Sequence, residues 1–411
     1  MTSPSSAGWA PPSDALRRYA ELVVKAGVDV QRDQPVGITA LSTEHAPLVR
    51  AIAVEAYRVG ARSVEVAYAD PYIDRTRIER GRDRDLSWSP PGVAAMVDAL
   101  EKDCGALIAV LGTPELELFG DVAPDRILRA KPAPHFGRTT FTAIAYPTEG
   151  WARSVFGTAD VSRLWEAIAH SVWLNEPDPV IACRMHVEKL KRRAQTLNGY
   201  RFDAIRFTGP GTDLTVGLGP DSVWGPVIWE APWGGTSLHS LPIEEVIATP
   251  DYRRTEGVVR ATRPVQLPFT RGAAIVRDLE LRFEAGRAVE ANASSGLAML
   301  EADLAQDGQA PFLGEIALID GASRVAQTGL TFIDTIYDES ATSHLAYGHH
   351  VNLPGRIEGF EAMTDNEELA RGLNVSKTHT DFMVGGPDVG VHGLYPSGIA
   401  IALITEDRWQ I

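Results

Sequence analysis

The pattern of apolar residues changes near Gly199, and this change restricts the possible folds of the chain more than any other feature. Before it, strand-like and helix-like segments alternate, which predicts a parallel sheet covered by helices. After it, short strand candidates follow one another between glycines and prolines at intervals of 8 to 12 residues, which is typical of an antiparallel sheet or barrel. We therefore predict an α/β protein with two domains. The first, residues 1–198, is an N-terminal α/β domain with a mainly parallel sheet, and the second, residues 199–411, is a β-rich α+β domain.

Four apolar segments of the first half are predicted as strands, with helices between them. The strand candidates are Pro35–Ala40, Ser63–Ala67, Ala106–Leu111 and Thr140–Tyr146. The first helix is capped by Ser42 or Thr43 and ends at Gly60. A second helix begins at Pro91, and a long one covers Pro177–Leu197.

The second half holds mostly short strand candidates and one clear helix. The strand candidates are Ala204–Phe207, Leu214–Val216, Glu245–Ala248, Gly257–Arg260, Ala273–Val276 and Leu279–Phe283. The helix is predicted over Ser295–Gln306, and Leu330–Ile336 is predicted as a strand that leads into a further helix. The sequence Gly209-Pro-Gly lacks the spacing of a phosphate-binding loop, so we interpret it as a turn.

The composition is that of an ordinary globular protein, with 44% hydrophobic and 23% charged residues. The net charge of −15 argues against a nucleic acid or an anionic membrane as partner. No apolar run approaches 18 residues, and the N-terminus lacks the pattern of a signal peptide. Cys104 and Cys183 are far apart and lie in apolar segments. We expect two buried thiols in a reducing compartment, and hence a cytoplasmic protein.

The last third of the chain contains a set of oxygen and imidazole ligands suited to divalent cations. The six candidates are Glu245, Glu315, Glu339, His344, His379 and Asp381. Four carboxylates and two imidazoles, with no thiolate, describe a site for one or two ions such as Zn, Co or Mn. Because such a site activates water, the set predicts a metal-dependent hydrolase.

Each candidate also has a simpler interpretation when it is taken alone. His379 and Asp381 lie on the same face if they are in a strand, but such pairs are often only hydrogen-bonded. Glu245 at the start of a strand is expected to face solvent. Glu315 stands between a glycine turn and an apolar strand, so its carboxylate is expected to point into the core, where it needs a partner or a metal. Asp338, beside Glu339, serves equally well as a helix cap.

Three motifs make the set of six residues more specific than any of them alone, because they occur together and in order. They are Leu313-Gly-Glu, Asp338-Glu-Ser-Ala-x-x-His and His379-x-Asp-Phe-Met-Val-Gly. With these motifs the chain resembles the aminopeptidase T/aminopeptidase S family of metallopeptidases nearly from end to end. The resemblance implies a homodimer with two metal ions in each C-terminal domain, held by the six residues above. It also implies a peptide or aminoacyl substrate cleaved at its N-terminus by a metal-activated water, with Glu315 as bridging ligand or base. Between Glu244 and Glu245 we choose Glu245, because the family keeps an acid directly before the valine.

One departure from the family pattern concerns a tyrosine seven residues after His344, which is replaced here by Val351. A phenol at the metal centre could stabilise an oxyanion, and a valine cannot. Tyr347, His349 or His350 could substitute, or the segment is only a polar loop. Two alternative functions follow from the superfamily and from this loss: a ring-cleaving dioxygenase with a single iron, and a dimeric relative without catalytic activity. The three acids Glu245, Glu315 and Glu339 are more than a single iron needs, which disfavours the dioxygenase.

Overall fold

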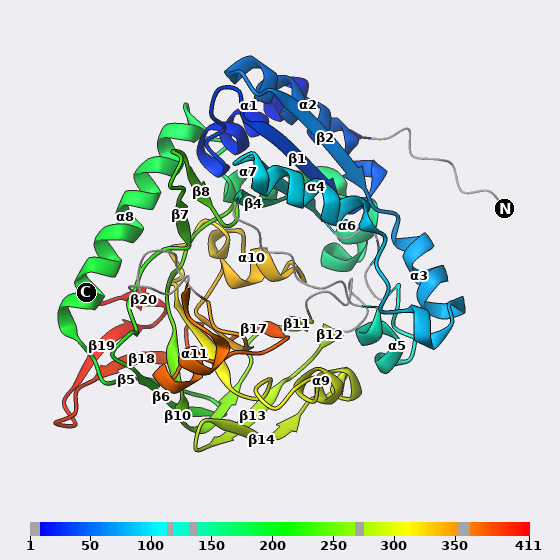
Figure 1. Ribbon diagram of the computed structural model, residues 1–411. Helices are drawn as coiled ribbons and strands as arrows, with labels where there is room; N and C mark the ends of the chain where they lie inside the picture. The colour runs from blue at the N-terminus through cyan, green and yellow to red at the C-terminus, as the bar shows by residue number, and fades with distance from the viewer. Residues whose placement is uncertain (1–8, 113–114, 116–117, 131–138, 268–274, 352–361) are drawn as a thin grey trace.

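The computed structural model describes residues 9–112, 115, 118–130, 139–267, 275–351 and 362–411 (Figure 1). The chain forms a mixed α/β fold with a parallel sheet in its first half and larger antiparallel sheets in its second half, as the sequence predicts. In Figure 1 the parallel sheet lies at the top of the molecule and the antiparallel sheets lie below it. None of the helices in the described ranges is long and apolar enough to cross a membrane.

The parallel sheet has four strands in the order β2-β1-β3-β4, and each neighbouring pair is parallel. Its strands are β1 (Pro35–Ala40), β2 (Ser63–Tyr68), β3 (Ala106–Leu111) and β4 (Thr140–Ala145). The helices of this half are α1 (Ser13–Leu22), α2 (Ala46–Val59), α3 (Pro71–Arg80), α4 (Pro91–Lys102), α5 (Pro124–Arg129), α6 (Glu149–Phe156) and α7 (Val161–Ser171). The predicted end of the first helix is confirmed, because Gly60 ends α2 with φ 106°. At its start, the Ser42 hydroxyl accepts from the backbone of Glu44 at 3.1 Å and caps a 3-10 turn, Thr43–His45, while α2 itself begins at Ala46 without a side-chain cap.

The largest sheet has eight antiparallel strands in the order β14-β13-β10-β6-β5-β18-β19-β20. Its strands are β5 (Ala204–Gly209), β6 (Thr212–Leu218), β10 (Pro250–Arg260), β13 (Glu280–Glu284), β14 (Arg287–Asn292), β18 (Gly390–Leu394), β19 (Ala400–Thr405) and β20 (Arg408–Trp409). The predicted turn at Gly209-Pro-Gly is confirmed, because it joins β5 to β6 in a hairpin.

A second antiparallel sheet has the order β17-β16-β15-β9. Its strands are β9 (Val246–Ala248), β15 (Leu313–Leu318), β16 (His344–Gly348) and β17 (His379–Met383), and every residue of β15 and β16 is buried. The shorter elements are β7 (Ile228–Glu230), β8 (Thr236–Leu238), β11 (Val265–Gln266), β12 (Ile275–Val276), α9 (Leu297–Leu304), α10 (Thr335–Glu339) and α11 (Asp365–Arg371). Part of the predicted strand Ala273–Val276 lies outside the described residues.

The predicted strand over Leu330–Ile336 is wrong. Residues 330–334 form an irregular loop, and α10 begins at Thr335. The buried carboxylate of Asp338 accepts from the backbone of Phe332 at 3.0 Å and of Asp334 at 3.2 Å, which folds this segment back on itself. Asp334, not Asp338, caps α10, since it accepts from the backbone of Tyr337 at 3.3 Å. Local side-chain hydrogen bonds therefore override an apolar pattern that resembles a strand.

The two halves of the chain are closely joined. Helix α8 (Pro179–Tyr200) extends along one side of the molecule from the parallel sheet towards the eight-stranded sheet (Figure 1). Residues 239–241 pair with Ala143 of β4, so the second half adds a short segment to the edge of the parallel sheet. Buried residues of both halves belong to one continuous core. The division into domains at residues 198 and 199 stays a prediction.

The two cysteines are both free thiols. Cys183 on α8 is buried, as expected, whereas Cys104 is half-buried. Burial raises the pKa of Cys183 to about 12, so this thiol stays protonated at neutral pH.

Candidate metal centre

The sheet β17-β16-β15-β9 carries five of the six candidate ligands on one face. Glu245 directly precedes β9, Glu315 lies on β15, His344 begins β16, and His379 and Asp381 lie on β17. The sixth candidate, Glu339, is the last residue of α10. Glu245 and the residues of the three motifs therefore meet in one place, although together they are spread over more than a hundred positions of the chain. We call these six residues the cluster.

A β-bulge turns Glu315 towards this face. Leu313 pairs with Tyr347, but Glu315 pairs with Ala346, so β15 contains one extra residue at Gly314. Without it, Leu313 and Glu315 would lie on the same face, two residues apart. Gly314 is required there because a Cβ would lie only 2.4 Å from the carbonyl oxygen of His349. The glycine before the acid in Leu313-Gly-Glu therefore has a direct structural role.

The register of the three longer strands places the other ligands around a small residue. Ala346 on β16 pairs with Glu315 on one side and with Asp381 on the other. Paired residues point to the same face, and the methyl group of Ala346 leaves room for both carboxylates above it. His379 pairs with Gly348 in the next register position and lies on this face as well. The His379-x-Asp spacing therefore does what the sequence predicts, and places both side chains on the same face of a strand.

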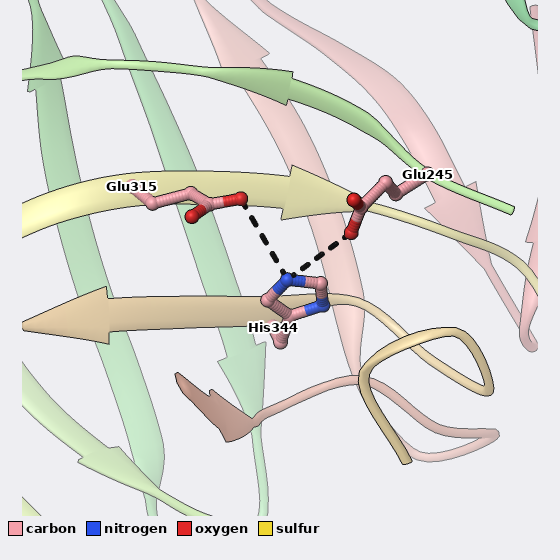
Figure 2. Close-up of side chains that lie close together, drawn as sticks. All are labelled: Glu245, Glu315 and His344. Atoms are coloured by element: carbon pink, nitrogen blue, oxygen red, sulfur yellow. Dashed lines mark ion pairs between the residues drawn. The ribbon is translucent and has the colours of Figure 1, made fainter. Parts of the chain in front are cut away.

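Glu315 lies between the two imidazoles. Figure 2 shows the Nε2 atom of His344 between two carboxylates, 3.8 Å from Oε1 of Glu315 and 3.4 Å from Oε2 of Glu245. The other oxygen of Glu315, Oε2, is 3.3 Å from Nε2 of His379, which is also 3.3 Å from Oδ1 of Asp381. One carboxylate therefore faces two neighbouring groups of ligand atoms.

The backbone orients both imidazoles. The Nδ1–H group of His344 donates to the carbonyl oxygen of Glu339 at 3.2 Å, and that of His379 donates to the carbonyl oxygen of His349 at 2.7 Å. A carbonyl oxygen can only accept, so the proton of each ring is held on Nδ1 and Nε2 is left facing the carboxylates. Histidines that bind metals usually have this arrangement. Because these partners are backbone atoms, the side-chain pattern of the sequence could not reveal them.

The cluster is deeply buried and holds more acids than bases. Glu245, Glu315, His344 and Asp381 are all less than 9% exposed. Burial raises the pKa of Glu245 to about 8, and burial together with the neighbouring carboxylates raises the pKa of Glu339 well above its usual value. Burial would also raise the pKa of Glu315, but the two neighbouring imidazoles outweigh it and lower the pKa to about 2. Carboxylates crowded in this way repel one another unless a cation lies between them.

The structure distinguishes the adjacent glutamates Glu244 and Glu245. Both are buried, but they point to different partners. Glu245 belongs to the cluster, and the expectation that it faces solvent is wrong. Its Oε2 atom accepts no hydrogen bond from any residue that the structure describes. Glu244 accepts from the backbone of Arg324 at 2.8 Å and lies 3.1 Å from His186. The unsatisfied oxygen of Glu245 is what a metal ligand would leave when no ion is bound.

The segment after His344 turns most of its side chains away from the cluster. The hydroxyl of Tyr347, on the opposite face of β16, donates to Asp303 at 2.9 Å. The ring of His349 accepts from the backbone of Ser376 at 3.3 Å, and His350 lies 2.9 Å from Glu368. None of these three side chains takes the place of the family tyrosine in the geometry described. Val351, by contrast, packs against the ligand face of the sheet.

The contacts of Val351 define its position. It packs on Ile247 of β9 and Ala317 of β15, which pair with each other across the sheet. Ala317 is two residues from Glu315 on the same strand and therefore on the same face. Position 351 thus lies beside the cluster, and valine gives it an apolar side chain.

Three overlapping groups of ligand atoms are close enough to share an ion. They are Glu245, Glu315 and His344; Glu315, His379 and Asp381; and Glu339, His344 and Asp381, and within each group the ligand atoms lie within 4.8 Å of one another. Oxygen and imidazole donors with oriented histidines and a shared carboxylate suit divalent cations. The fold and this arrangement define a metal-dependent hydrolase.

Comparison with known proteins specifies the class further. Residues 13–409 match the thermophilic metalloprotease (M29) family. Aminopeptidase T of Thermus thermophilus is 36% identical, with 96% of this chain and 98% of that protein covered, and aminopeptidase PepS of Streptococcus thermophilus is 31% identical with the same coverage. The structure of wild-type AmpT from Thermus thermophilus superposes with a TM-score of 0.84 at 34% identity, covering 97% of this chain and 99% of that chain.

The chain belongs to the thermophilic metalloprotease (M29) family. It is a peptidase, and its family implies the use of divalent metal. The predicted resemblance to aminopeptidases T and S is confirmed.

Proposed function

We propose that this protein is an aminopeptidase that removes N-terminal residues from peptides with two divalent ions held by the cluster. The single observation that carries the proposal is the position of Glu315, whose two oxygens face two different groups of ligands. One ion would be held by Glu245, Glu315 and His344, and the other by Glu315, His379 and Asp381. Glu339 would complete the set, since it lies with His344 and Asp381. The choice of metal would be Zn, Co or Mn, which accept such oxygen and imidazole donors.

The protein's own residues would fix the geometry of the reaction. Bound divalent ions of this kind lower the pKa of water and polarise a carbonyl group. Glu315 is placed either to bridge the two ions or to accept a proton from the attacking water, because its two oxygens face both groups of ligands. The Nδ1 hydrogen bonds of both histidines keep their rings from rotating. The net charge of −15 favours the approach of a cationic peptide N-terminus.

The substrate would reach the cluster from the side of β17. The side chain of His379 is 29% exposed, whereas that of His344 is 1% exposed. Among the cluster members that the structure describes on the sheet, His379 is therefore the most accessible. The same proposal includes a homodimer in the cytoplasm, for which twice the mass of one chain in light scattering would be the expected result.

The function is tested with metal-free protein that is reloaded with Zn, Co or Mn. A panel of aminoacyl chromogenic amides and short peptides should be cleaved, while the same compounds with an acetylated N-terminus should not. This pairing isolates the requirement for a free amino group. If no compound is cleaved by protein that has bound metal, or if the acetylated compounds are cleaved equally well, the aminopeptidase proposal is wrong.

The alternative functions make different predictions for the same protein. A single-iron dioxygenase would need only a small histidine and carboxylate set, and would leave Glu245, Glu315 and Glu339 buried together without a cation between them. Such burial is costly. A relative without activity would bind no metal or would bind it without turnover. The observed grouping of all six residues favours the peptidase.

A further inference from the structure

His239 lies outside the cluster, and its backbone is fixed on both sides. Its N–H donates to the carbonyl oxygen of Val227 at 3.1 Å, and its carbonyl oxygen accepts from the N–H of Ala143 on β4 at 2.8 Å. The residue therefore stands at the junction between the parallel sheet and the β7–β8 hairpin. With both backbone polar groups paired, the base of its side chain has little freedom.

The same junction continues to the sheet that carries the cluster. Gly225 and Ile247 of β9 exchange two backbone hydrogen bonds, of 3.0 and 2.9 Å. Residues 225–227 thus lie between β9 on one side and His239 on the other. Two strand spacings of about 4.8 Å place the backbone of His239 roughly 10 Å from β9, which is within reach of a substrate bound at the cluster.

The imidazole of His239 is accessible to solvent, unlike most residues around it. Its ring contacts Phe141 on β4, with ring centroids 5.4 Å apart and an angle of 51° between the planes. Val227, whose carbonyl oxygen accepts from His239, packs on the pair formed by Ile247 and Ala317 beside the cluster.

We propose that His239 is a further catalytic residue, which donates a hydrogen bond to the carbonyl oxygen of the scissile bond as negative charge develops there. The inference rests on the proposed function. The imidazole is not a member of any candidate ligand group among the described residues, so it remains available to a substrate. A fixed backbone, an accessible ring and a place next to Val227, which packs on Ile247 and Ala317 beside the cluster, are what such a donor needs. Val351, which packs on the same pair as Val227, offers no polar group there.

Three variants test the proposal through kinetics. His239→Ala should lower kcat by roughly 10²–10³-fold with little change in KM, as expected when a donor acts mainly in the transition state. His239→Gln should recover part of the loss, since its amide N–H lies near the position of Nε2. His392→Ala, a matched change on β18 in the other sheet, should behave as wild type. If His239→Ala raises KM and leaves kcat unchanged, His239 is not an oxyanion donor.

A binding measurement separates this inference from the proposed function. The probe is the phosphonic acid analogue of leucine, whose tetrahedral oxygens imitate the charged intermediate, and free leucine serves as comparison. By calorimetry, metal-loaded wild type should bind the phosphonate, and His239→Ala should bind it at least tenfold more weakly while binding leucine equally. Failure of wild type to bind the phosphonate counts against the proposed function itself. Equal binding by wild type and His239→Ala overturns the role of His239 alone.

Discussion

At the scale of single residues, burial and two neighbouring histidines act in opposite directions on the charge of Glu315. It is buried at 4% exposure, yet the two imidazoles beside it, with Nε2 atoms at 3.8 and 3.3 Å from its oxygens, favour its ionised form. A single glycine, Gly314, supplies the bulge that turns it from the core face to the ligand face. A buried charge of this kind is stable only with its partners in place. The residue therefore links the local backbone geometry directly to the proposed chemistry.

Replacing Glu315 by glutamine should abolish turnover while preserving the fold. Glutamine keeps the shape but loses the charge that a bridging ligand or a base requires. Removing a general base alone typically costs ~10²–10⁴-fold in rate, and weaker metal binding adds to this loss. Turnover of aminoacyl amides and circular dichroism are the measurements. Glu55→Gln is the matched control, because Glu55 is also buried but pairs with Arg58 on α2. A Glu315→Gln protein within threefold of wild type would show that Glu315 is only structural.

At the scale of elements, hydrogen bonds to Asp303 hold strands β16 and β17 together on the face opposite the cluster. Asp303, at 1% exposure on α9, accepts from the hydroxyl of Tyr347 on β16 at 2.9 Å. It also accepts from Thr380 on β17 at 2.9 Å and from Thr378 just before β17 at 3.0 Å. Thr378 and Thr380 flank His379 on the opposite face of the strand. One buried carboxylate thus holds in place the two strands that carry three of the ligands.

The change Asp303→Asn should weaken both the fold and the metal site. The amide offers one acceptor oxygen where the carboxylate offers two, and since Oδ1 accepts from Gln306 and Oδ2 from the three hydroxyls, at least one of these donors loses its partner. An unsatisfied buried group costs about 1–3 kcal/mol, and disturbed support behind metal ligands costs roughly tenfold or more in metal affinity. Urea unfolding of metal-free protein and calorimetric titration with Zn measure the two effects. Thr380→Ser keeps the hydroxyl and should remain close to wild type. An unchanged unfolding midpoint and metal affinity in Asp303→Asn would refute this supporting role.

At the scale of the whole molecule, local patterns predicted the elements well and their assembly poorly. The alternation in the first half predicted the parallel sheet, and the spacing His379-x-Asp predicted two side chains on one face. The burial of Glu245 and the bulge at Gly314 could not be predicted, because they depend on strands that are distant in sequence. The strand predicted over Leu330–Ile336 failed because the Asp338 carboxylate folds the segment back on itself, and Arg263, 67 residues before Leu330 and 75 before Asp338, donates to both. Contacts of this range leave no periodic signal in the chain.

The pairing of the two halves is another property of the whole molecule that the sequence did not reveal. Residues 239–241 lie beside β4. They end three residues before Glu244, which is followed by the cluster member Glu245. Helix α8 continues through the predicted domain boundary. The parallel sheet therefore contributes to the surroundings of the metal centre, although all six candidate ligands come from residue 245 onwards. This arrangement is what brings His239 to the site.

The number of metal ions per chain tests the central claim most directly. Metal-free protein should be titrated with Zn, Co or Mn, freed of excess metal on a desalting column, and analysed for metal content and turnover in the same samples. We predict saturation at two ions per chain, with full turnover only when the second ion is bound. A single iron per chain, or full stability and turnover with no bound metal, would contradict the two-metal account.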